Sequence, residues 1–301
     1  RRSRRARWWG LGATLAVLVA GTLGSWWWVT RPPPTSGPPL VVGWAPVLDP
    51  AVRAKELEPL RRWLERRTHR PVRFEVAESY DALAESLVSG GLAFAVLPPF
   101  LYLQVAARVP SMEPLATELF DGSAGNDGVL LVPERSQVGS IAELKGRRIC
   151  YTDRSSTTGW LLPRATLRAN GVDPDRDVVG EHFSGTHLQL LRDLGEGRCD
   201  VGGTFSGAYL SADRAGVRVA QMRVLAVTGH APHDVVCAGP AAEADDRRLL
   251  RESLLAFDAP ESLGMPVVGS VERLSGFRAP DTTAYDRLRR VWEDEARREG
   301  R

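Results

Sequence analysis

The sequence predicts an α/β protein of two lobes that follows a short N-terminal segment. From about residue 40 onward, short apolar runs alternate with helical patterns, as in α/β folds. At 301 residues the chain exceeds the usual single compact domain. Its apolar content of 43% and charged content of 25% are ordinary for a globular protein.

The first thirty residues predict one transmembrane helix. Five of the first seven residues are arginine, and residues 8–29 carry no charge. A helix of that length spans roughly 33 Å, enough to cross the hydrocarbon core of a bilayer. The arginines predict a cytoplasmic start, so the rest of the chain is expected on the extracytoplasmic face. An uncleaved anchor and a cleaved signal peptide are both open; the anchor is favoured because no clear cleavage motif follows. Residues 31–39 (RPPPTSGPP) are expected to form a stiff proline-rich linker.

The pattern of residues 40–97 predicts strands and helices in alternation. Residues 40–44 are a short apolar run typical of a strand, and 51–67 is an amphipathic helix ending in basic residues. A strand at 72–76, a helix at 80–89 and a buried strand at 93–97 are expected next. Short strands separated by helices imply mainly parallel sheets.

The second half continues the alternation. We expect strands at 128–133, 148–151, 178–183, 199–203, 224–228 and 235–238. A helical turn is expected at 141–144, and helices at 159–169, 187–194, 245–257 and 281–298. Asn170-Gly171 supplies a stop signal for the helix at 159–169, and the last two helices are heavily charged on their outer faces.

Four consecutive hydroxyl residues stand where a strand gives way to a helix. Ser155, Ser156, Thr157 and Thr158 precede Gly159, near the expected helix start. Free backbone N–H groups and the helix dipole favour an anion there, and hydroxyls can donate to its oxygens. A glycine would let a ligand approach the backbone closely. The alternative is an N-cap that serves only its own helix, but four hydroxyls exceed what capping needs.

A second loop repeats this arrangement. Residues 184–187 (SGTH) again lie between an expected strand and a helix, and His187 can donate to an oxyanion. Taken alone, such a histidine is more often a capping or surface residue. In an open parallel sheet both loops would emerge at the carboxyl edge of the strands, where ligands bind.

These segments resemble the substrate-binding proteins of phosphate, phosphite and phosphonate ABC transporters. The likeness rests on residues 143–175 (ELKGRRICYTDRSSTTGWLLPRATLRANGVDPD) and on GTH at 185–187, CDVGG at 199–203 and TGHAPHDVV at 228–236, and it covers roughly residues 41–290. It implies a type II periplasmic-binding-protein fold, two lobes joined by two crossover strands. We expect lobe 1 over residues 40–130 and 232–301, and lobe 2 over 131–231.

The resemblance also implies ligand contacts. Ser156, Thr157 and Thr158, with Gly159, would hold the oxyanion, and His187 would complete the site. Tyr102 matches a tyrosine of the opposing lobe, and Trp44 follows the first strand; both could equally be core aromatics. Phe205 stands where aminoalkylphosphonate binders carry an acidic residue, so we expect no ammonium-bearing ligand, because an apolar ring cannot pair with an ammonium group.

Charge and cysteine patterns exclude several function classes. The net charge of +2 owes its sign to the N-terminal arginines, which argues against a nucleic-acid-binding surface. The three cysteines, Cys150, Cys199 and Cys237, are far apart and odd in number, so we expect buried hydrophobes rather than disulfides or metal ligands. The five histidines show no metal-binding spacing, and no catalytic set is evident.

We therefore expect a binding protein, not an enzyme, with no cofactor or metal. It would capture phosphonate, phosphite or phosphate between two lobes and deliver it to an ABC permease, attached to the membrane by its N-terminal helix. A membrane-anchored sensor of the same fold is the alternative, because fold alone does not dictate transport.

Overall fold

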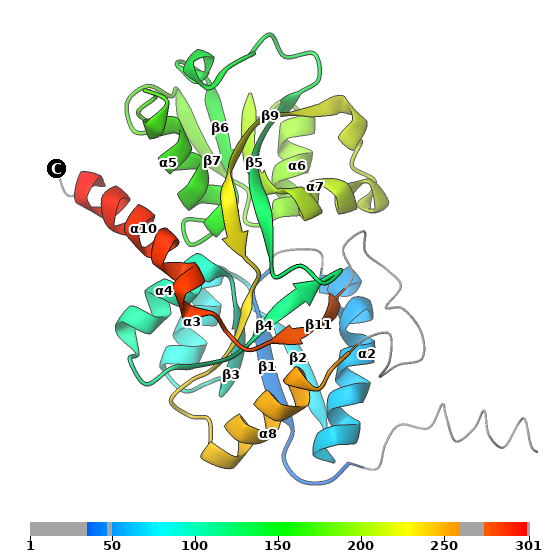
Figure 1. Cartoon of the computed structure of the whole chain (residues 1–301). Coiled ribbons are helices and arrows are strands. Elements are labelled where there is room, and N and C mark those ends of the chain that lie inside the picture. The colour runs from blue at the N-terminus through cyan, green and yellow to red at the C-terminus, as the bar shows by residue number, and fades with distance from the viewer. Residues whose placement is uncertain (1–34, 47–49, 259–273, 300–301) are drawn as a thin grey trace, which may run out of the picture.

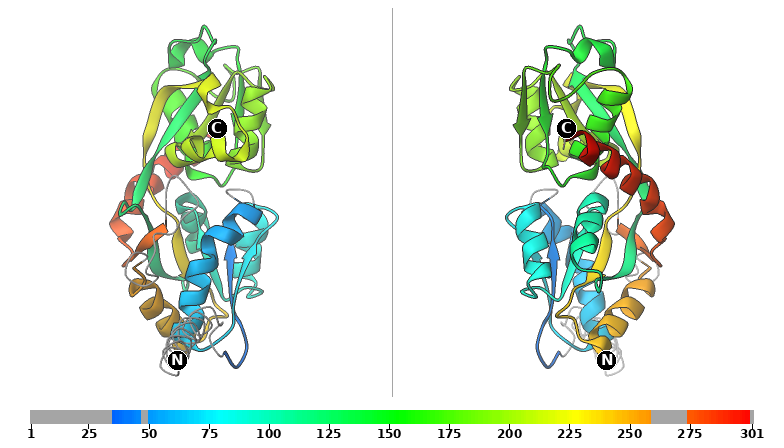
Figure 2. Two further views of the ribbon diagram at one scale, coloured as in Figure 1. Left: turned by 90° about the vertical axis from the view of Figure 1, so that its right-hand side faces the viewer. Right: turned by 90° about the vertical axis from the view of Figure 1, so that its left-hand side faces the viewer.

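The computed structural model describes residues 35–46, 50–258 and 274–299, which form two α/β lobes stacked end to end (Figures 1 and 2). Within these ranges no helix has both the length and the apolar character needed to cross a membrane. The predicted transmembrane helix at residues 1–30 lies outside the described residues.

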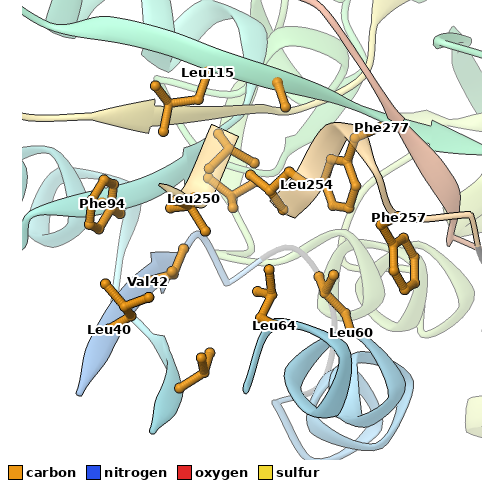
Figure 3. Close-up of a cluster of buried hydrophobic side chains, with 14 of the residues drawn as sticks. Leu40, Val42, Leu60, Leu64, Phe94, Leu115, Leu250, Leu254, Phe257 and Phe277 are labelled. Atoms are coloured by element: carbon orange, nitrogen blue, oxygen red, sulfur yellow. The ribbon is translucent and has the colours of Figure 1, made fainter. Parts of the chain in front are cut away.

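Lobe 1 is built on a six-stranded sheet with the order β11-β4-β10-β3-β1-β2. Its strands are β1 (Leu40–Trp44), β2 (Val72–Val76), β3 (Phe94–Leu97), β4 (Glu113–Phe120), β10 (Val235–Ala238) and β11 (Leu274–Arg278). Its helices are α2 (Pro50–Thr68), α3 (Tyr80–Val88), α4 (Pro99–Arg108) and α8 (Ala244–Leu255). Helices α2 and α8 cover one face, where Leu60 and Leu64 meet Leu250 and Leu254 in a core that also includes Phe257 (Figure 3).

Lobe 2 is built on a five-stranded sheet with the order β7-β6-β8-β5-β9. Its strands are β5 (Gly125–Pro133), β6 (Arg148–Tyr151), β7 (Gly180–Phe183), β8 (Val201–Phe205) and β9 (Met222–Pro232). Its helical segments are η1 (Ile141–Leu144), η2 (Thr157–Leu161), α5 (Leu162–Ala169), α6 (His187–Gly195), α7 (Ser206–Ser211), η3 (Ala212–Ala215) and η4 (Val219–Gln221).

Two segments carry the chain between the lobes. Strand β4 leads into β5, and β9 returns the chain to β10 (Figure 1). The expected lobe boundary at residue 130 falls inside β5, and the one at 231 falls at the end of β9.

Both sheets are mixed, so the prediction of mainly parallel sheets is wrong. β1 pairs in parallel with β2 and β3, and β6 with β7 and β8. The first strand after each crossing runs the other way: β5 is antiparallel to β8 and β9, and β10 is antiparallel to β3 and β4. Returning strands of this kind pair over long sequence distances, which a local alternation of strands and helices cannot reveal.

The last helix crosses from one lobe to the other. After β11 and the short η5 (Thr282–Tyr285), helix α10 (Asp286–Glu299) runs beside α4 and then along the α5 side of lobe 2 (Figure 1). Leu288 packs in a lobe 1 cluster, whereas Val291 packs against a lobe 2 cluster. Trp292 touches both clusters.

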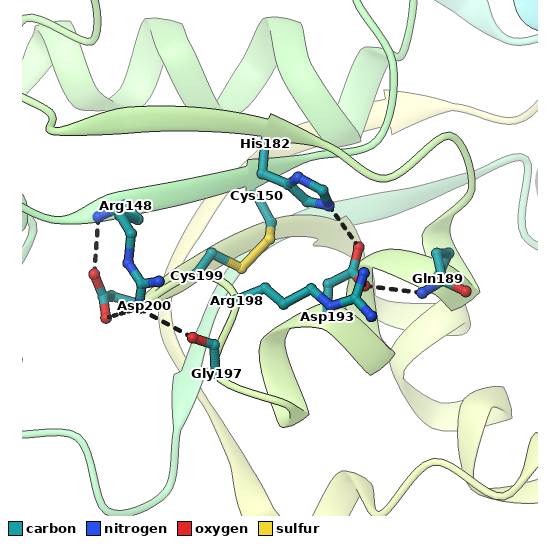
Figure 4. The surroundings of a disulfide bond; sticks show 9 residues. All are labelled: Arg148, Cys150, His182, Gln189, Asp193, Gly197, Arg198, Cys199 and Asp200. Carbon is teal, nitrogen blue, oxygen red and sulfur yellow. Dashed lines mark hydrogen bonds and ion pairs between the residues drawn. A yellow bond between two sulfur atoms is a disulfide. The ribbon is translucent and has the colours of Figure 1, made fainter.

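A disulfide bond joins Cys150 of β6 to Cys199, 49 residues further along the chain (Figure 4). The prediction that these two cysteines are unpaired hydrophobes is therefore wrong. The prediction relied on the long separation of the cysteines in sequence. β6 and β8 are neighbours in the sheet, however, so Cys150 in β6 lies close to Cys199, just before β8. Cys237 is free and buried, as predicted.

Candidate functional site

The hydroxyl residues lie at the start of an unusual helix. Ser156 is the N-cap of η2, and its Oγ accepts a hydrogen bond from the Gly159 N–H at 3.0 Å. This first turn is π-helical, because the Leu161 N–H donates to the Ser156 carbonyl five residues earlier. A wider turn of this kind leaves an additional N–H group without an intrahelical acceptor, and such turns are frequent at functional sites. The helix start therefore offers backbone donors together with its dipole to an anion.

The hydroxyls themselves are buried and partly engaged. Ser156, Thr157 and Thr158 are 2%, 3% and 7% exposed. Thr157 Oγ1 accepts a hydrogen bond of 2.9 Å from the backbone N–H of Phe100, in the first turn of α4 of lobe 1. Capping thus uses one lone pair of Ser156, and a contact between the lobes uses one of Thr157. Each hydroxyl keeps its proton, so each can still donate to an oxyanion.

Gly159 is fixed by close packing. A Cβ at this position would stand 2.6 Å from the Thr152 Cβ and 2.7 Å from the Ser156 Oγ, with the Thr152 hydroxyl nearer still. A real Cβ atom essentially never lies this close to another side chain, so only glycine lets the helix start lie against Thr152. The Thr152 side chain thus fills the space beside the Gly159 Cα, where the sequence had suggested that a ligand could approach.

His187 lies at the start of α6, beside the same threonine. Its Nδ1 is 2.9 Å from the Thr204 Oγ1 and 3.3 Å from the Thr152 Oγ1. Burial lowers the pKa of His187 to about 3, so the ring is neutral at physiological pH. A hydroxyl donating to Nδ1 places the ring proton on Nε2, where it can donate to a ligand. The Phe205 ring meets the imidazole edge-on at 4.9 Å.

Thr152 therefore brings the two predicted loops together. Its N–H donates to the Gly159 carbonyl at 3.2 Å, and its own carbonyl accepts from the Gly185 N–H at 2.8 Å. The loop after β6 and the loop after β7 emerge at one edge of the sheet, as expected for parallel neighbours. The turn that carries Ser156, Thr157 and Thr158 and the helix start that carries His187 thus meet at Thr152.

Trp44 and Tyr102 lie in the core of lobe 1. Trp44 is 2% exposed and packs edge-on against Phe74 at 4.9 Å, with no hydrogen-bond partner for its buried Nε1 among the described residues. Tyr102 packs against Tyr285 at 4.8 Å, and burial raises its pKa. In the described part of the chain, neither makes a hydrogen bond or ring contact to the hydroxyl turn. Their packing is that of core aromatics, the alternative that the sequence left open.

Tyr80 contributes to the site and was missed. It begins α3 of lobe 1, is 1% exposed, and lies near the Ser156 side chain of lobe 2. Burial raises the pKa of its phenol, and the nearby Asp234 and Asp153 add to this, so the group stays protonated. The signal in the sequence was Ser79, an N-cap that places Tyr80 at a helix start just beyond β2. Thr152 and Thr204 were missed for a similar reason, as single polar residues at strand ends.

Comparison with known proteins identifies a family. The family described as "ABC transporter, phosphonate, periplasmic substrate-binding protein" matches residues 42–285. The phosphate-import protein PhnD of Mycolicibacterium smegmatis is 27% identical over 157 residues, and the match spans about half of each chain, 49%.

Solved structures share the fold. PhnD1 of Prochlorococcus marinus, in complex with methylphosphonate, superposes with a TM-score of 0.74 at 17% identity, covering 86% of this chain and 98% of its own. A binding protein component of an ABC phosphonate transporter from Pseudomonas aeruginosa gives 0.75 at 17% identity, covering 85% and 86%. The aliphatic sulphonate binding protein SsuA of Escherichia coli gives 0.58 at 14%, covering 88% of both chains.

The two-lobe fold and the resemblance drawn from the sequence are confirmed. The match covers most of the chain and belongs to binding proteins, so the prediction that the chain is not an enzyme also holds at family level. The chain belongs to the family of periplasmic substrate-binding proteins of phosphonate ABC transporters.

Proposed function

We propose that the protein captures a small phosphorus oxyanion (phosphonate, phosphite or phosphate) between its lobes and presents it to an ABC permease on the extracytoplasmic face of the membrane. The observation that carries the proposal is that Thr152 joins the hydroxyl turn Ser156–Thr158, at the π-helical start of η2, to His187 at the start of α6. The family match favours this transport role over the sensing alternative.

The donors at this site are neutral. Backbone N–H groups, hydroxyls and an uncharged imidazole point to an oxyanion, and no described lysine or arginine hydrogen-bonds to the Ser156–Thr158 turn or to His187. Each hydrogen bond to a charged ligand contributes about 1.5–3 kcal/mol, so four or five directed donors can support micromolar binding after the entropy of association. So small a ligand cannot gain this from apolar burial.

The named ligands of the relatives agree with this chemistry. One relative is named as a phosphate importer, and one solved structure holds methylphosphonate. Phe205 packs against His187, where an ammonium-bearing ligand would need a carboxylate. We therefore expect alkyl- or hydrogen-substituted phosphorus anions, or phosphate, in preference to aminoalkylphosphonates.

Lobe closure would couple capture to transport. Thr157 and Ser156 of lobe 2 already meet Phe100 and Tyr80 of lobe 1, so a ligand at the turn would contact a surface that both lobes complete. Binding there would stabilise the closed arrangement, which a permease can distinguish from the open one.

Isothermal titration calorimetry tests the proposal. Methylphosphonate, phosphite and phosphate are titrated into the full chain, with methanesulfonate and sulfate as tetrahedral sulfur analogues. We expect at least one phosphorus anion to bind, and Thr157→Ala and His187→Ala each to weaken it at least tenfold, since each removes one donor. Thr283→Ala and His230→Ala, which change an exposed hydroxyl and an exposed imidazole, serve as matched controls. Binding of the sulfur anions alone would refute the phosphorus assignment.

A further inference from the structure

Helix α10 connects the two lobes through a buried carboxylate. Its first turns pack in lobe 1, where Leu288 is 1% exposed. Its later turns lie along α5 of lobe 2, as Figure 1 shows, and Glu295 there is 3% exposed. The Glu295 Oε2 accepts from the Arg168 Nε at 3.0 Å and lies 3.7 Å from the Arg164 Nε.

The two arginines belong to the helix that carries the hydroxyl turn. η2 and α5 are continuous, so Thr157 and Arg164 stand on one helical segment about two turns apart. Arg164 also binds two carboxylates of lobe 2, Asp175 and Glu181, at 2.5 and 2.6 Å. Glu295, in contrast, links this helix to α10, an element anchored in lobe 1.

The same contact region includes the meeting point of the lobes. The Arg164 guanidinium lies 5.1 Å over the Trp160 ring, which stacks on Phe100 of α4 at 6.0 Å. The Phe100 N–H is the donor to Thr157 Oγ1. Trp292 of α10 closes the group, with its ring 5.7 Å from Phe100. Holding Glu295 against the arginines therefore keeps η2 in contact with lobe 1.

We propose that Glu295 is a positioning residue for ligand capture: through Arg164 and Arg168 it holds the oxyanion-binding helix in the arrangement in which both lobes complete the site. This rests on the proposed function of that site. Without the carboxylate, the two guanidiniums of α5 lose their anionic partner on α10, and the lobes separate more often. Affinity then falls in proportion to the fraction of molecules that remain binding-competent.

The test uses Glu295→Gln, which keeps the size of the side chain and removes its charge. We expect the dissociation constant for methylphosphonate, phosphite or phosphate, whichever the wild type binds, to rise about tenfold or more. Arg168→Gln should also raise the dissociation constant. The double variant Glu295→Gln/Arg168→Gln should bind no more weakly than the weaker-binding single variant, because both substitutions remove the same contact. Glu293→Gln, an exposed carboxylate two residues away on α10, is the matched control and should bind as the wild type does.

A distance measurement separates positioning from a general loss of stability. Nitroxide labels at Arg176→Cys in lobe 2 and Asp245→Cys in lobe 1 occupy sites that are 86% and 88% exposed. The native cysteines do not react, because two form the disulfide and the third is buried. Pulsed electron paramagnetic resonance should show a broader, longer distance distribution in Glu295→Gln and Arg168→Gln than in the wild type and in Glu293→Gln.

The outcomes distinguish this inference from the proposed function. If the wild type binds a phosphorus anion and both variants match it in affinity and distance distribution, the positioning role is refuted while the function stands. If the wild type binds none of the three anions, the proposed function fails, and the distance distributions alone decide the role of Glu295. Should Glu295→Gln fail to fold, the affinity and distance distribution of Arg168→Gln decide the positioning role in its place.

Discussion

The Cys150–Cys199 disulfide makes the folding stability of lobe 2 dependent on an oxidising environment. The bond closes a loop with a sequence separation of 49 residues. The loop-entropy relation for cross-links of this length gives a stabilisation of about 4 kcal/mol, through loss of freedom in the unfolded chain. Reduction of the wild-type protein should remove a stabilisation of that order, and Cys150→Ala/Cys199→Ala should remove about the same, plus a small contribution from the space left by two buried sulfurs.

Denaturant unfolding followed by tryptophan fluorescence measures the effect, with and without a thiol reductant. We expect the free energy of unfolding of the oxidised protein to fall by roughly 3–4 kcal/mol on reduction, and that of the double variant to be unaffected by reductant. Cys237→Ala, which changes the buried free cysteine, is the control: it should keep the response to reductant.

Ligand affinity should respond to the same change. β6 leads directly into Thr152, and β8 carries Thr204; these two hydroxyls hold the His187 ring. Loosening the link between the strands should therefore weaken anion binding as well as stability. The reasoning fails if alkylation of the denatured, unreduced protein labels three thiols, or if reductant leaves the unfolding midpoint of the wild type unchanged.

Two further predictions concern the site itself. Gly159→Ala should lower anion affinity at least tenfold and destabilise the fold by about 1–3 kcal/mol, because its Cβ would overlap Thr152; Gly180→Ala, where no atom lies within 4 Å of the added Cβ, should change neither quantity in calorimetry or unfolding. Burial lowers the folded pKa of His187 to about 3, below the unfolded value of about 6.5, so the unfolded state alone takes up a proton between these values and stability falls as pH falls. Denaturant unfolding at pH 6 and pH 4 should show a loss of about 1.4 kcal/mol per pH unit from this residue, which His187→Gln removes; a variant with an unchanged slope would contradict the assignment.

Much of the fold could be predicted because its strands are short and buried. β1, with its burial on both faces, matches the expected strand at 40–44 residue for residue. α4 was not expected, because Pro98 and Pro99 are typical of a loop. Proline is nevertheless favourable at the first helical position, and α4 begins at Pro99. β4 and β11 were missed, and the disulfide could not be foreseen, since pairing of distant segments leaves no local pattern.

The two main segments of the candidate site could also be predicted, but the residues that join them could not. The Ser156–Thr158 turn and His187 follow adjacent strands, so their meeting was implied by parallel pairing. What joins them, Thr152, is a single residue whose role depends on the exact approach of two loops. The contacts from lobe 1, Tyr80 and the Phe100 N–H, depend on how the lobes face each other, which no local pattern contains.

The hydroxyl of Thr157 can accept one hydrogen bond and donate another at the same time. Its oxygen accepts a hydrogen bond from the Phe100 N–H of lobe 1, while its own hydrogen can be donated to a bound anion. An anion that draws on this hydrogen makes the oxygen more electron-rich and so strengthens the bond it accepts. Occupancy and closure would then reinforce each other through one atom, so a valine here should blunt the communication between the lobes, whereas a serine should preserve it.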